Sequence, residues 1–228
     1  MDQDDRLRHA SSFGSAAVAY AEHRPDYAQA AVRWALEPAP GPRVLDLGAG
    51  TGKLTATLIA LGIDVIAVEP DPAMLAELRR ALVRHGRRGP GDRQGARTQR
   101  LLAGLWNLMD DRVPWVAELA RVSGSAAIGP RDTPESWRAE TAQLHLPVTG
   151  VVARFGSPEQ EVFPHGQRRT ADSLAATIAT RAGLLVMPEQ EQEATLGRIR
   201  AFLGSRPETT CGEFTLPTLT GVLRVRSL

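Results

Sequence analysis

The chain has 228 residues, 27 basic and 26 acidic side chains, and 43% apolar residues, a size and composition typical of one soluble globular domain. It has no apolar run long enough to cross a membrane, and its polar N-terminus does not resemble a signal peptide. A lone cysteine, Cys211, excludes an internal disulfide and a cysteine metal cluster, so we expect a cytoplasmic protein without a metal.

The first predicted elements are two short helices. Residues 16–36 have a helical pattern that is interrupted at Arg24 and Pro25. Asp26 is placed to cap a second helix over residues 27–36. A turn-rich break, EPAPGP, then separates these helices from the next element.

A strand, a glycine turn, a helix and a second strand follow. Residues 43–50 (RVLDLGAG) predict a buried strand ending in glycines, and residues 53–61 predict a helix with Gly62 at its end. Residues 63–69 (IDVIAVE) are apolar and β-branched, which predicts another buried strand. This order is a βαβ unit and predicts an α/β fold with a parallel sheet.

The next predicted elements alternate between helix and strand. Asp71 caps a helix that starts at Pro72 and runs to about Val83. Residues 101–107 (LLAGLWN) predict a buried strand, and residues 114–121 a helix.

The rest of the chain predicts three more helices and two strands. The expected helices cover residues 132–144, 170–181 and 188–203, the second with Thr170 as its cap. Residues 148–156 can form a strand, and residues 221–228 (GVLRVRSL) predict an edge strand.

The glycine turn DLGAGTGK, residues 46–53, carries the chemistry. Its three alternating glycines let the backbone approach a ligand closely, and the following helix presents free N–H groups to it. A phosphate-binding P-loop is excluded because positions 47 and 54 are leucines, and the G-x-G-x-x-G dinucleotide fingerprint fails at Lys53. Glu69 ends the next strand 21 positions after Gly48, a spacing that suits a carboxylate on both ribose hydroxyls of an adenosine ligand.

These segments resemble a known family. The stretches VLDLGAGTGKLT and VIAVEPDPAML are similar to the class I S-adenosylmethionine (SAM)-dependent methyltransferases. Residues 13–34 resemble the N-terminal segment of the small-molecule, type 11 branch, and FTLPTLTGVLRVR resembles its actinobacterial members. The resemblance covers most of the chain except residues 84–100.

The resemblance implies a Rossmann-like fold, with a mostly parallel sheet flanked by helices and fewer than the usual seven strands. It implies one domain made of an N-terminal helical cap (1–42), a SAM-binding core (43–83), a flexible bridge (84–100) and the remaining sheet and helices (101–228). The implied reaction transfers a methyl group from SAM to a small molecule.

The resemblance also implies a set of binding residues. Those around the cofactor would be Asp46, Gly48, Ala49, Gly50, Thr51, Gly52, Glu69, Pro70 and Met74. The loop would wrap the methionine half, Asp46 would act through water on the amino group, and Glu69 would hold the ribose. Pro70 and Met74 would pack near the adenine. Tyr20, Arg24, Tyr27 and Asn107 would face the substrate.

Plainer interpretations stay open for several of these residues. Met74 fits core packing as well as an adenine contact, and Arg24 fits the end of a helix. Trp106 and Trp115 fit the core. Catalytic residues are not identified, because methyl transfer from an activated sulfonium mainly needs alignment of donor and acceptor.

Residues 84–100 do not match the family. They hold six arginines and four glycines, and the 17 residues are too few for the two βα units that relatives carry here, since one βαβ unit needs about 30 residues. We interpret this as a deletion that removes a strand between those of residues 43–50 and 101–107. Either the latter strand slides across to pair, or the edge of the former is exposed.

Two further functions remain as alternatives. A chain that has lost a sheet strand could be an impaired remnant or binding module rather than an active enzyme. The arginines of residues 84–100 could bind nucleic acid, but this stretch has no aromatic residue for base stacking and the rest of the chain is slightly acidic.

Overall fold

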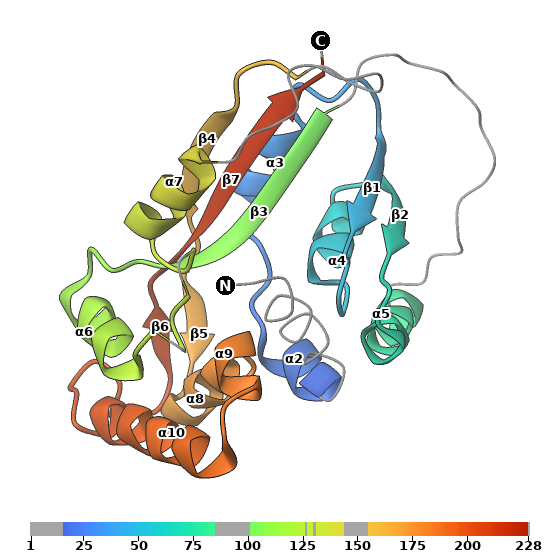
Figure 1. Cartoon of the computed structure of the whole chain (residues 1–228). Helices are drawn as coiled ribbons and strands as arrows, with labels where there is room; N and C mark the ends of the chain where they lie inside the picture. The colour runs from blue at the N-terminus through green and yellow to red at the C-terminus, as the bar shows by residue number, and fades with distance from the viewer. Residues whose placement is uncertain (1–15, 85–100, 126, 130, 144–154, 228) are drawn as a thin grey trace.

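The computed structural model describes residues 16–84, 101–125, 127–129, 131–143 and 155–227. The first half contains α2 (Ala17–His23), α3 (Gln29–Leu36), β1 (Arg43–Leu47), α4 (Lys53–Ala60), β2 (Asp64–Val68) and α5 (Pro72–Arg84). The second half contains β3 (Leu101–Met109), α6 (Pro114–Ser123), α7 (Pro134–Ala142), β4 (Glu159–Pro164), β5 (Gln167–Arg169), α8 (Ala171–Ala179), α9 (Ala182–Leu185), α10 (Glu189–Gly204), β6 (Phe214–Leu216) and β7 (Thr218–Arg226). Helices and strands alternate from α3 to α5, which confirms an α/β fold (Figure 1).

The βαβ unit forms as its local sequence predicts. β1 and β2 pair in parallel, with Leu45 opposite Ile66 and Leu47 opposite Val68. The Asp71 carboxylate caps α5 by accepting the N–H groups of Ala73 and Met74, each at 2.9 Å. Gly62 follows α4 in the left-handed region that favours glycine, at φ +81°.

The expectation that β1 and β2 are buried strands is wrong for one of their faces. Leu45, Leu47, Ile66 and Val68 lie on that face and are 55%, 67%, 40% and 46% exposed. The opposite face carries Asp46, which is 6% exposed. The apolar sequence predicted two covered faces, but among the described residues only one face is covered by helices.

The second sheet is antiparallel, in the order β3-β7-β4. β7 is its central strand and is buried from Thr218 to Val225, so the prediction of a C-terminal edge strand is wrong. The alternation in GVLRVRSL resembled a half-exposed strand, whereas β3 and β4 pair on either side of it. Most of the strand predicted over residues 148–156 lies outside the described residues; Phe155 makes an isolated bridge to Ser227.

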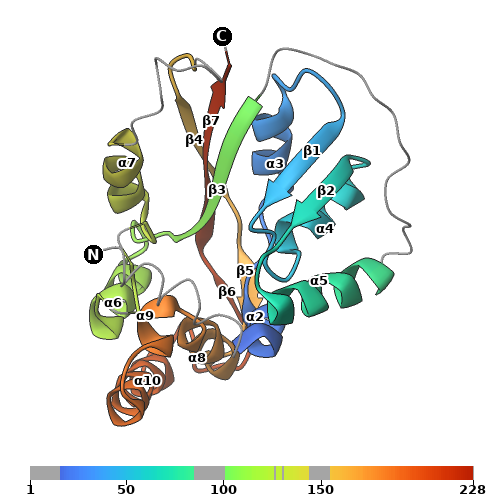
Figure 2. The ribbon, with the colours of Figure 1, turned by 45° about the vertical axis from the view of Figure 1, so that its right-hand side comes forward.

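A single, mostly parallel sheet does not form in the described part of the chain. Only β1 and β2 are parallel, β5 pairs with β6 in a separate antiparallel ribbon, and β1 does not pair with β3. Figure 2 shows β1 and β3 running in the same direction on either side of a gap. The strand of residues 101–107 has therefore formed, as β3, without sliding across to β1.

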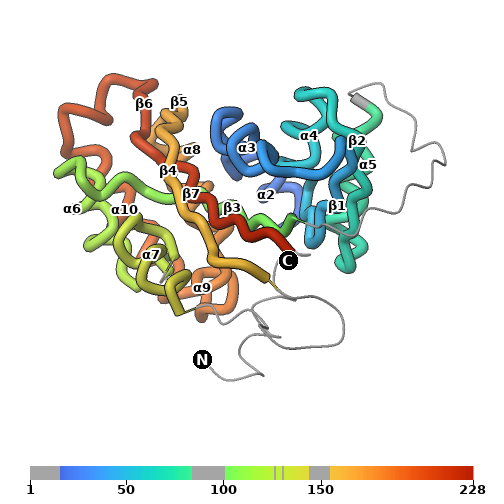
Figure 3. The backbone as a smooth tube through the Cα atoms, turned by 90° about the horizontal axis from the view of Figure 1, so that it is seen from above, coloured from blue at the N-terminus to red at the C-terminus, as the bar shows by residue number. Residues whose placement is uncertain are grey.

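The main core lies beside the antiparallel sheet. Apolar side chains of α6, α8 and α10 form its largest cluster, which includes Val116, Leu119, Ile178, Ile199 and Leu203. Seen from above, these helices lie on one side of β3 and β7, and β1, α4 and α5 lie on the other (Figure 3). This core includes Met109 of β3, whereas β7 packs on α3 through Val222 and on α7 through Leu219.

Two tryptophans predicted for the core pack there to different extents. Trp115 is 8% exposed and meets Phe214 edge to face. Trp106 is half-buried, and its ring lies 6.0 Å from that of the fully buried Trp137 at a tilt of 52°.

The predicted helix caps are partly confirmed. Thr170 caps α8 by accepting the Ser173 N–H at 3.1 Å. Asp26 does not cap α3, which starts at Gln29 with Ala28 at the capping position. None of the described helices is long and apolar enough to span a membrane.

Candidate functional site

The glycine loop lies directly after β1 and is attached to the end of β2. Gly48 and Ala49 donate their N–H groups to the Val68 carbonyl at 2.8 and 3.1 Å. Gly50 and Gly52 donate to Glu69 and to Ala49. The N–H groups that the loop leaves for a ligand are therefore those of the first turn of α4, because an α-helix leaves these groups without intrahelical partners.

The three glycines differ in what surrounds them. All have positive φ, at 69°, 57° and 87° for Gly48, Gly50 and Gly52. A Cβ on either of the first two would meet nothing within 4 Å, whereas a Cβ on Gly52 would lie 2.5 Å from Leu78 Cδ1 of α5. Gly48 and Gly50 thus leave space for a ligand, and Gly52 lets the loop pack on α5.

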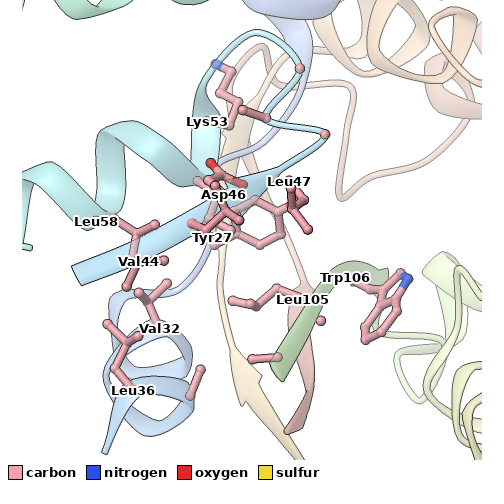
Figure 4. A pocket seen from close by; sticks show the side chains of 18 of the residues that line it. Tyr27, Val32, Leu36, Val44, Asp46, Leu47, Lys53, Leu58, Leu105 and Trp106 are labelled. Carbon is pink, nitrogen blue, oxygen red and sulfur yellow. The ribbon is translucent and has the colours of Figure 1, made fainter. Parts of the chain in front are cut away.

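A cavity of about 860 Å³ opens beside this loop. Figure 4 shows its wall, with Asp46 and Leu47 of β1 and Tyr27 on one side and Leu105 and Trp106 of β3 on the other. The structure brings most of the predicted binding residues to this cavity, namely Tyr20, Arg24, Tyr27, Asp46, Gly48, Ala49, Gly50, Thr51 and Asn107. Gly52, Glu69, Pro70 and Met74 do not line it.

Asp46 and Tyr27 are two ionisable groups of the wall whose pKa values are raised by burial. The Asp46 carboxylate accepts a hydrogen bond from Thr55 Oγ1 at 2.5 Å. Burial raises the pKa of Asp46, with a smaller upward contribution from Glu69, while the Thr55 hydrogen bond opposes the shift. Burial also raises the pKa of Tyr27 to about 12, assisted by Tyr20 and Asp46. The Tyr27 hydroxyl therefore stays neutral at physiological pH.

Glu69 uses both carboxylate oxygens within the protein. Oε2 accepts the Gly50 N–H at 2.7 Å, and Oε1 accepts the Asp71 N–H at 2.8 Å. This arrangement ties the glycine loop to the start of α5. Each carboxylate oxygen can accept a second hydrogen bond, so these two contacts leave Glu69 able to accept from ribose hydroxyls.

Thr51 contributes a polar atom to the site without using it. The residue is 4% exposed, and its Oγ1 has no hydrogen-bond partner among the described residues. A buried hydroxyl without a partner is costly. Its position on the cavity wall makes it a candidate contact for a polar ligand.

Met74 is a core residue. It is 4% exposed, and its neighbour one turn later, Leu78, is 2% exposed. Both face inward from α5. The plainer interpretation of Met74 therefore fits the structure, and the proposed adenine contact has no cavity lining to support it.

Arg24 and Asn107 hold the N-terminal segment against the rest of the molecule. Arg24 lies over the Tyr20 ring at 4.8 Å and donates to the Thr180 carbonyl at 3.2 Å. Asn107 donates to the Pro25 carbonyl at 3.3 Å and accepts from Thr220 at the same distance. Both residues line the cavity while bonding to segments distant in sequence.

Sequence reasoning missed Asp132. It lines the cavity, forms an ion pair with Arg181 and accepts the Gly129 N–H at 2.5 Å. It also missed Lys53, whose pKa is lowered by burial. Lys53 ends the glycine turn DLGAGTGK, which is the signal that could have identified it, whereas Asp132 reaches the cavity through tertiary packing.

The apolar part of the wall was also missed. It comes from α3, β1, α4 and β3, and includes Val32, Leu36, Val44, Leu47, Leu54, Leu58, Leu101, Leu105 and Trp106. Each is ordinary core composition in its own segment. Only the arrangement of the four elements collects them around one cavity.

Similar proteins were found among curated sequences. Uncharacterized methyltransferase Rv3342 of Mycobacterium tuberculosis strain H37Rv is 34% identical over 220 residues, covering 86% of this chain and 87% of its own length. Uncharacterized methyltransferases MT3445 of M. tuberculosis strain CDC 1551 and Mb3374 of M. bovis match to the same extent. The chain belongs to this family of methyltransferases.

The other comparisons add little to this assignment. No protein-family model matches the chain. A putative type II methyltransferase from Anaeromyxobacter dehalogenans aligns with 90% of this chain and 96% of its own, at 18% identity and a TM-score of 0.44, which is too weak a likeness to argue from. Membership in the methyltransferase family, a class of transferases, therefore rests on the mycobacterial relatives.

Proposed function

We propose that the protein is a class I, SAM-dependent methyltransferase of the type 11 branch, acting on a small molecule. The observation that carries this proposal is the cavity beside the Gly48–Thr51 loop, at the carboxyl end of β1. Open α/β sheets bind ligands at this end of their strands. Its volume of about 860 Å³ fits the range of roughly 300–1,000 Å³ for small-molecule sites.

The residues present fit such a cofactor at the loop. Gly48 and Gly50 leave room where any side chain would project, and Thr51 has an unused buried hydroxyl. Asp46 lies behind the loop, and Glu69 is one hydrogen bond away through Gly50. SAM, when bound, supplies an activated methyl group.

The chain's own residues would then position the acceptor and exclude water. Leu105 and Trp106 of β3 supply an apolar surface, and Asn107 and Asp132 supply polar groups. Alignment of two bound reactants lowers the barrier by removing translational and rotational freedom beforehand. A base is required only where the acceptor loses a proton during attack.

A catalytically impaired remnant is the second candidate. The observation behind it is that β1 has no partner strand on its β3 side among the described residues. We infer that a deletion around residues 84–100 removed the strand between them. This would weaken cofactor binding without unfolding the rest.

Calorimetric titration with S-adenosylhomocysteine tests the proposal. We expect one-to-one binding in the micromolar range, weakened at least tenfold by Gly50→Val, because a branched side chain is strained at φ +57° and projects into the open space. Gly62→Val is the matched control, since Gly62 also has positive φ, +81°, but lies outside the cavity. Glu69→Ala should weaken binding as strongly as Gly50→Val.

Each outcome separates the candidates. Absence of binding by a folded protein would favour the remnant. If Gly50→Val and Gly62→Val weakened S-adenosylhomocysteine binding equally, the loss would be due to general destabilisation of the protein and not to the loop. Salt-sensitive DNA or RNA binding that disappears on deletion of residues 84–100 would instead support the nucleic-acid alternative.

A further inference from the structure

Arg24 is a cation on the cavity wall that has no ion-pair partner in the described part of the chain. Its Nη2 donates to the Thr180 carbonyl at 3.2 Å, and its guanidinium lies over the Tyr20 ring. Its Nε is buried and has no hydrogen-bond partner among the described residues. Burial lowers the pKa of Arg24, because the charged form loses hydration, and Tyr20 partly opposes this shift. A buried cation in this state is costly unless a ligand completes its contacts.

The carboxylate that acts on Arg24 is already paired with another arginine. Asp132 forms an ion pair with Arg181 and accepts the Gly129 N–H at 2.5 Å. Both members of this ion pair are largely buried, with side chains that are 20% and 15% exposed. Arg181 lowers the pKa of Arg24 and Asp132 raises it, so the three charges interact. We call these three side chains the Arg24 cluster; it carries two positive charges and one negative charge.

The other charged groups of the cavity lining do not supply the missing negative charge. Arg43 is paired with Asp64, with Nε 3.2 Å from Oδ2. Asp46 and Lys53 lie beside the glycine loop, on the side proposed for the cofactor (Figure 4). The positive charge of the Arg24 cluster is therefore not neutralised by the described lining.

Arg24 lies on the same side of the strands as the glycine loop. Figures 1 and 2 both show α2 beyond the carboxyl ends of β1 and β3, and α2 packs against α5 and α8. Asn107 of β3 donates to the carbonyl of Pro25, the next residue after Arg24, at 3.3 Å. Arg24 thus belongs to the end of the cavity where β3 supplies Asn107 and Trp106.

We propose that Arg24 determines acceptor specificity by binding a carboxylate, so that the methyl acceptor is a small carboxylic acid with an apolar body. This rests on the proposed function, since it takes the cavity as the acceptor site. A guanidinium binds a carboxylate through charge-assisted hydrogen bonds from its planar set of N–H donors. The apolar body would lie against Leu105 and Trp106 of β3.

The charge of the Arg24 cluster favours a carboxylate over a phosphate. One carboxylate supplies the single negative charge that the cluster lacks. A phosphate monoester carries roughly 1.5 to 2 negative charges at neutral pH and would leave an excess beside Asp132. A neutral amide of the same shape would leave the Arg24 cluster with its positive charge.

Three probes of equal chain length test this recognition. Octanoate, octanamide and octyl phosphate are titrated calorimetrically into the full chain, with and without S-adenosylhomocysteine. We expect octanoate to bind at least tenfold more tightly than octanamide, and octyl phosphate to bind no more tightly than octanoate. Comparing octanoate with octanamide isolates the charge, since both present the same apolar body.

A set of arginine variants locates the preference. Arg24→Gln should reduce the ratio of octanoate to octanamide affinity to near one, and Arg24→Lys should keep part of it because the charge remains. Arg33→Gln is the matched control, at an exposed position of α3 outside the cavity, and should leave the ratio within twofold. The ratio is measured within each variant, so general destabilisation, which weakens both probes, does not change it.

The opposing results are equally specific. Equal binding of octanoate and octanamide, tighter binding of octyl phosphate, or a preference retained by Arg24→Gln would overturn the proposal. A tenfold loss of S-adenosylhomocysteine binding in Arg24→Gln would also overturn it, by assigning Arg24 to the cofactor. Binding of S-adenosylhomocysteine without an octanoate preference contradicts this proposal alone, whereas a folded chain that does not bind S-adenosylhomocysteine contradicts the proposed function.

Discussion

At the scale of single residues, the site combines groups that are satisfied within the protein with groups that are left open. Glu69 and Asp46 are bonded to Gly50 and Thr55, at 2.7 and 2.5 Å. Thr51 has a buried hydroxyl without a partner among the described residues. The satisfied groups give the loop its shape, and Thr51 lines the cavity with its buried hydroxyl unused.

Asp46 gives a residue-scale prediction for stability against pH. A carboxyl group whose pKa is raised on folding binds more protons in the native state, so its contribution to stability falls as pH rises above its unfolded value of 3.8. Asp46→Asn removes this loss. We therefore expect the stability of the variant, relative to the natural chain, to increase with pH from about 3.8 upward and then level off, measured by urea unfolding.

Asp110 is the control with the opposite sign. Hydrogen bonds from Arg112, the side-chain bond at 2.6 Å first, lower the pKa of Asp110 below 3.8. Its contribution to stability is present above that value and is lost as pH falls through the lowered pKa. Asp110→Asn should therefore lose stability relative to the natural chain as pH rises towards 3.8, and a parallel course for the two variants would contradict the assignment.

At the scale of elements, the central position of β7 explains Gly221, which the local sequence does not explain. Gly221 lies in the middle of β7, where strand propensity disfavours glycine. A Cβ at this position would lie 2.9 Å from the Trp137 ring and 3.0 Å from Leu108. The glycine lets α7 pack its buried tryptophan directly on the strand.

Gly221→Ala is the corresponding prediction. Overpacking of this core should cost about 1–3 kcal/mol of unfolding free energy, measured in urea. Gly197→Ala in α10 is the matched control, because nothing lies within 4 Å of its Cβ and the residue is in an exposed helix interior. That change should instead stabilise the protein by about 0.5–1 kcal/mol. A neutral Gly221→Ala would show that Trp137 can move.

The helices and strands also show which features local sequence could predict. The helix cap at Asp71, the end of α4 before Gly62 and the cap at Thr170 were predicted, and each is confirmed. These features depend on neighbours within four residues. β4 and β5 were not predicted, because their sequences, EQEVFP and QRR, carry no apolar alternation and pair only through β7 and β6.

At the scale of the whole molecule, the parallel sheet β1-β2 is separate from the antiparallel sheet β3-β7-β4 and has an uncovered face. Parallel sheets are normally covered on both faces. Leu45, Leu47, Ile66 and Val68 instead form an exposed apolar face across β1 and β2. The molecule therefore presents a hydrophobic surface next to its open strand edge, which favours association.

This surface predicts a fluorescence change. The double variant Ile66→Thr and Val68→Thr should lower the fluorescence of the dye ANS and raise the protein concentration at which aggregates form, since threonine keeps a β-branched shape and replaces apolar surface. Both residues lie outside the cavity, so ligand binding is a separate readout. Val18→Thr with Val83→Thr is the control, on α2 and α5, and equal effects would contradict a special role for the sheet face.

The sequence by itself determined the βαβ unit, the glycine loop and the family resemblance that the mycobacterial relatives support. Glycines, helix caps and apolar runs act over a few residues, so the local structure that they produce can be predicted from the sequence alone. Tertiary structure alone decided that β7 is central, that β1 and β3 do not pair, and that Asp132 reaches the cavity. Strand pairing and cavity walls depend on which distant segments meet, and here Asn107 pairs with Thr220 and Asp132 with Arg181, across separations that no local pattern encodes.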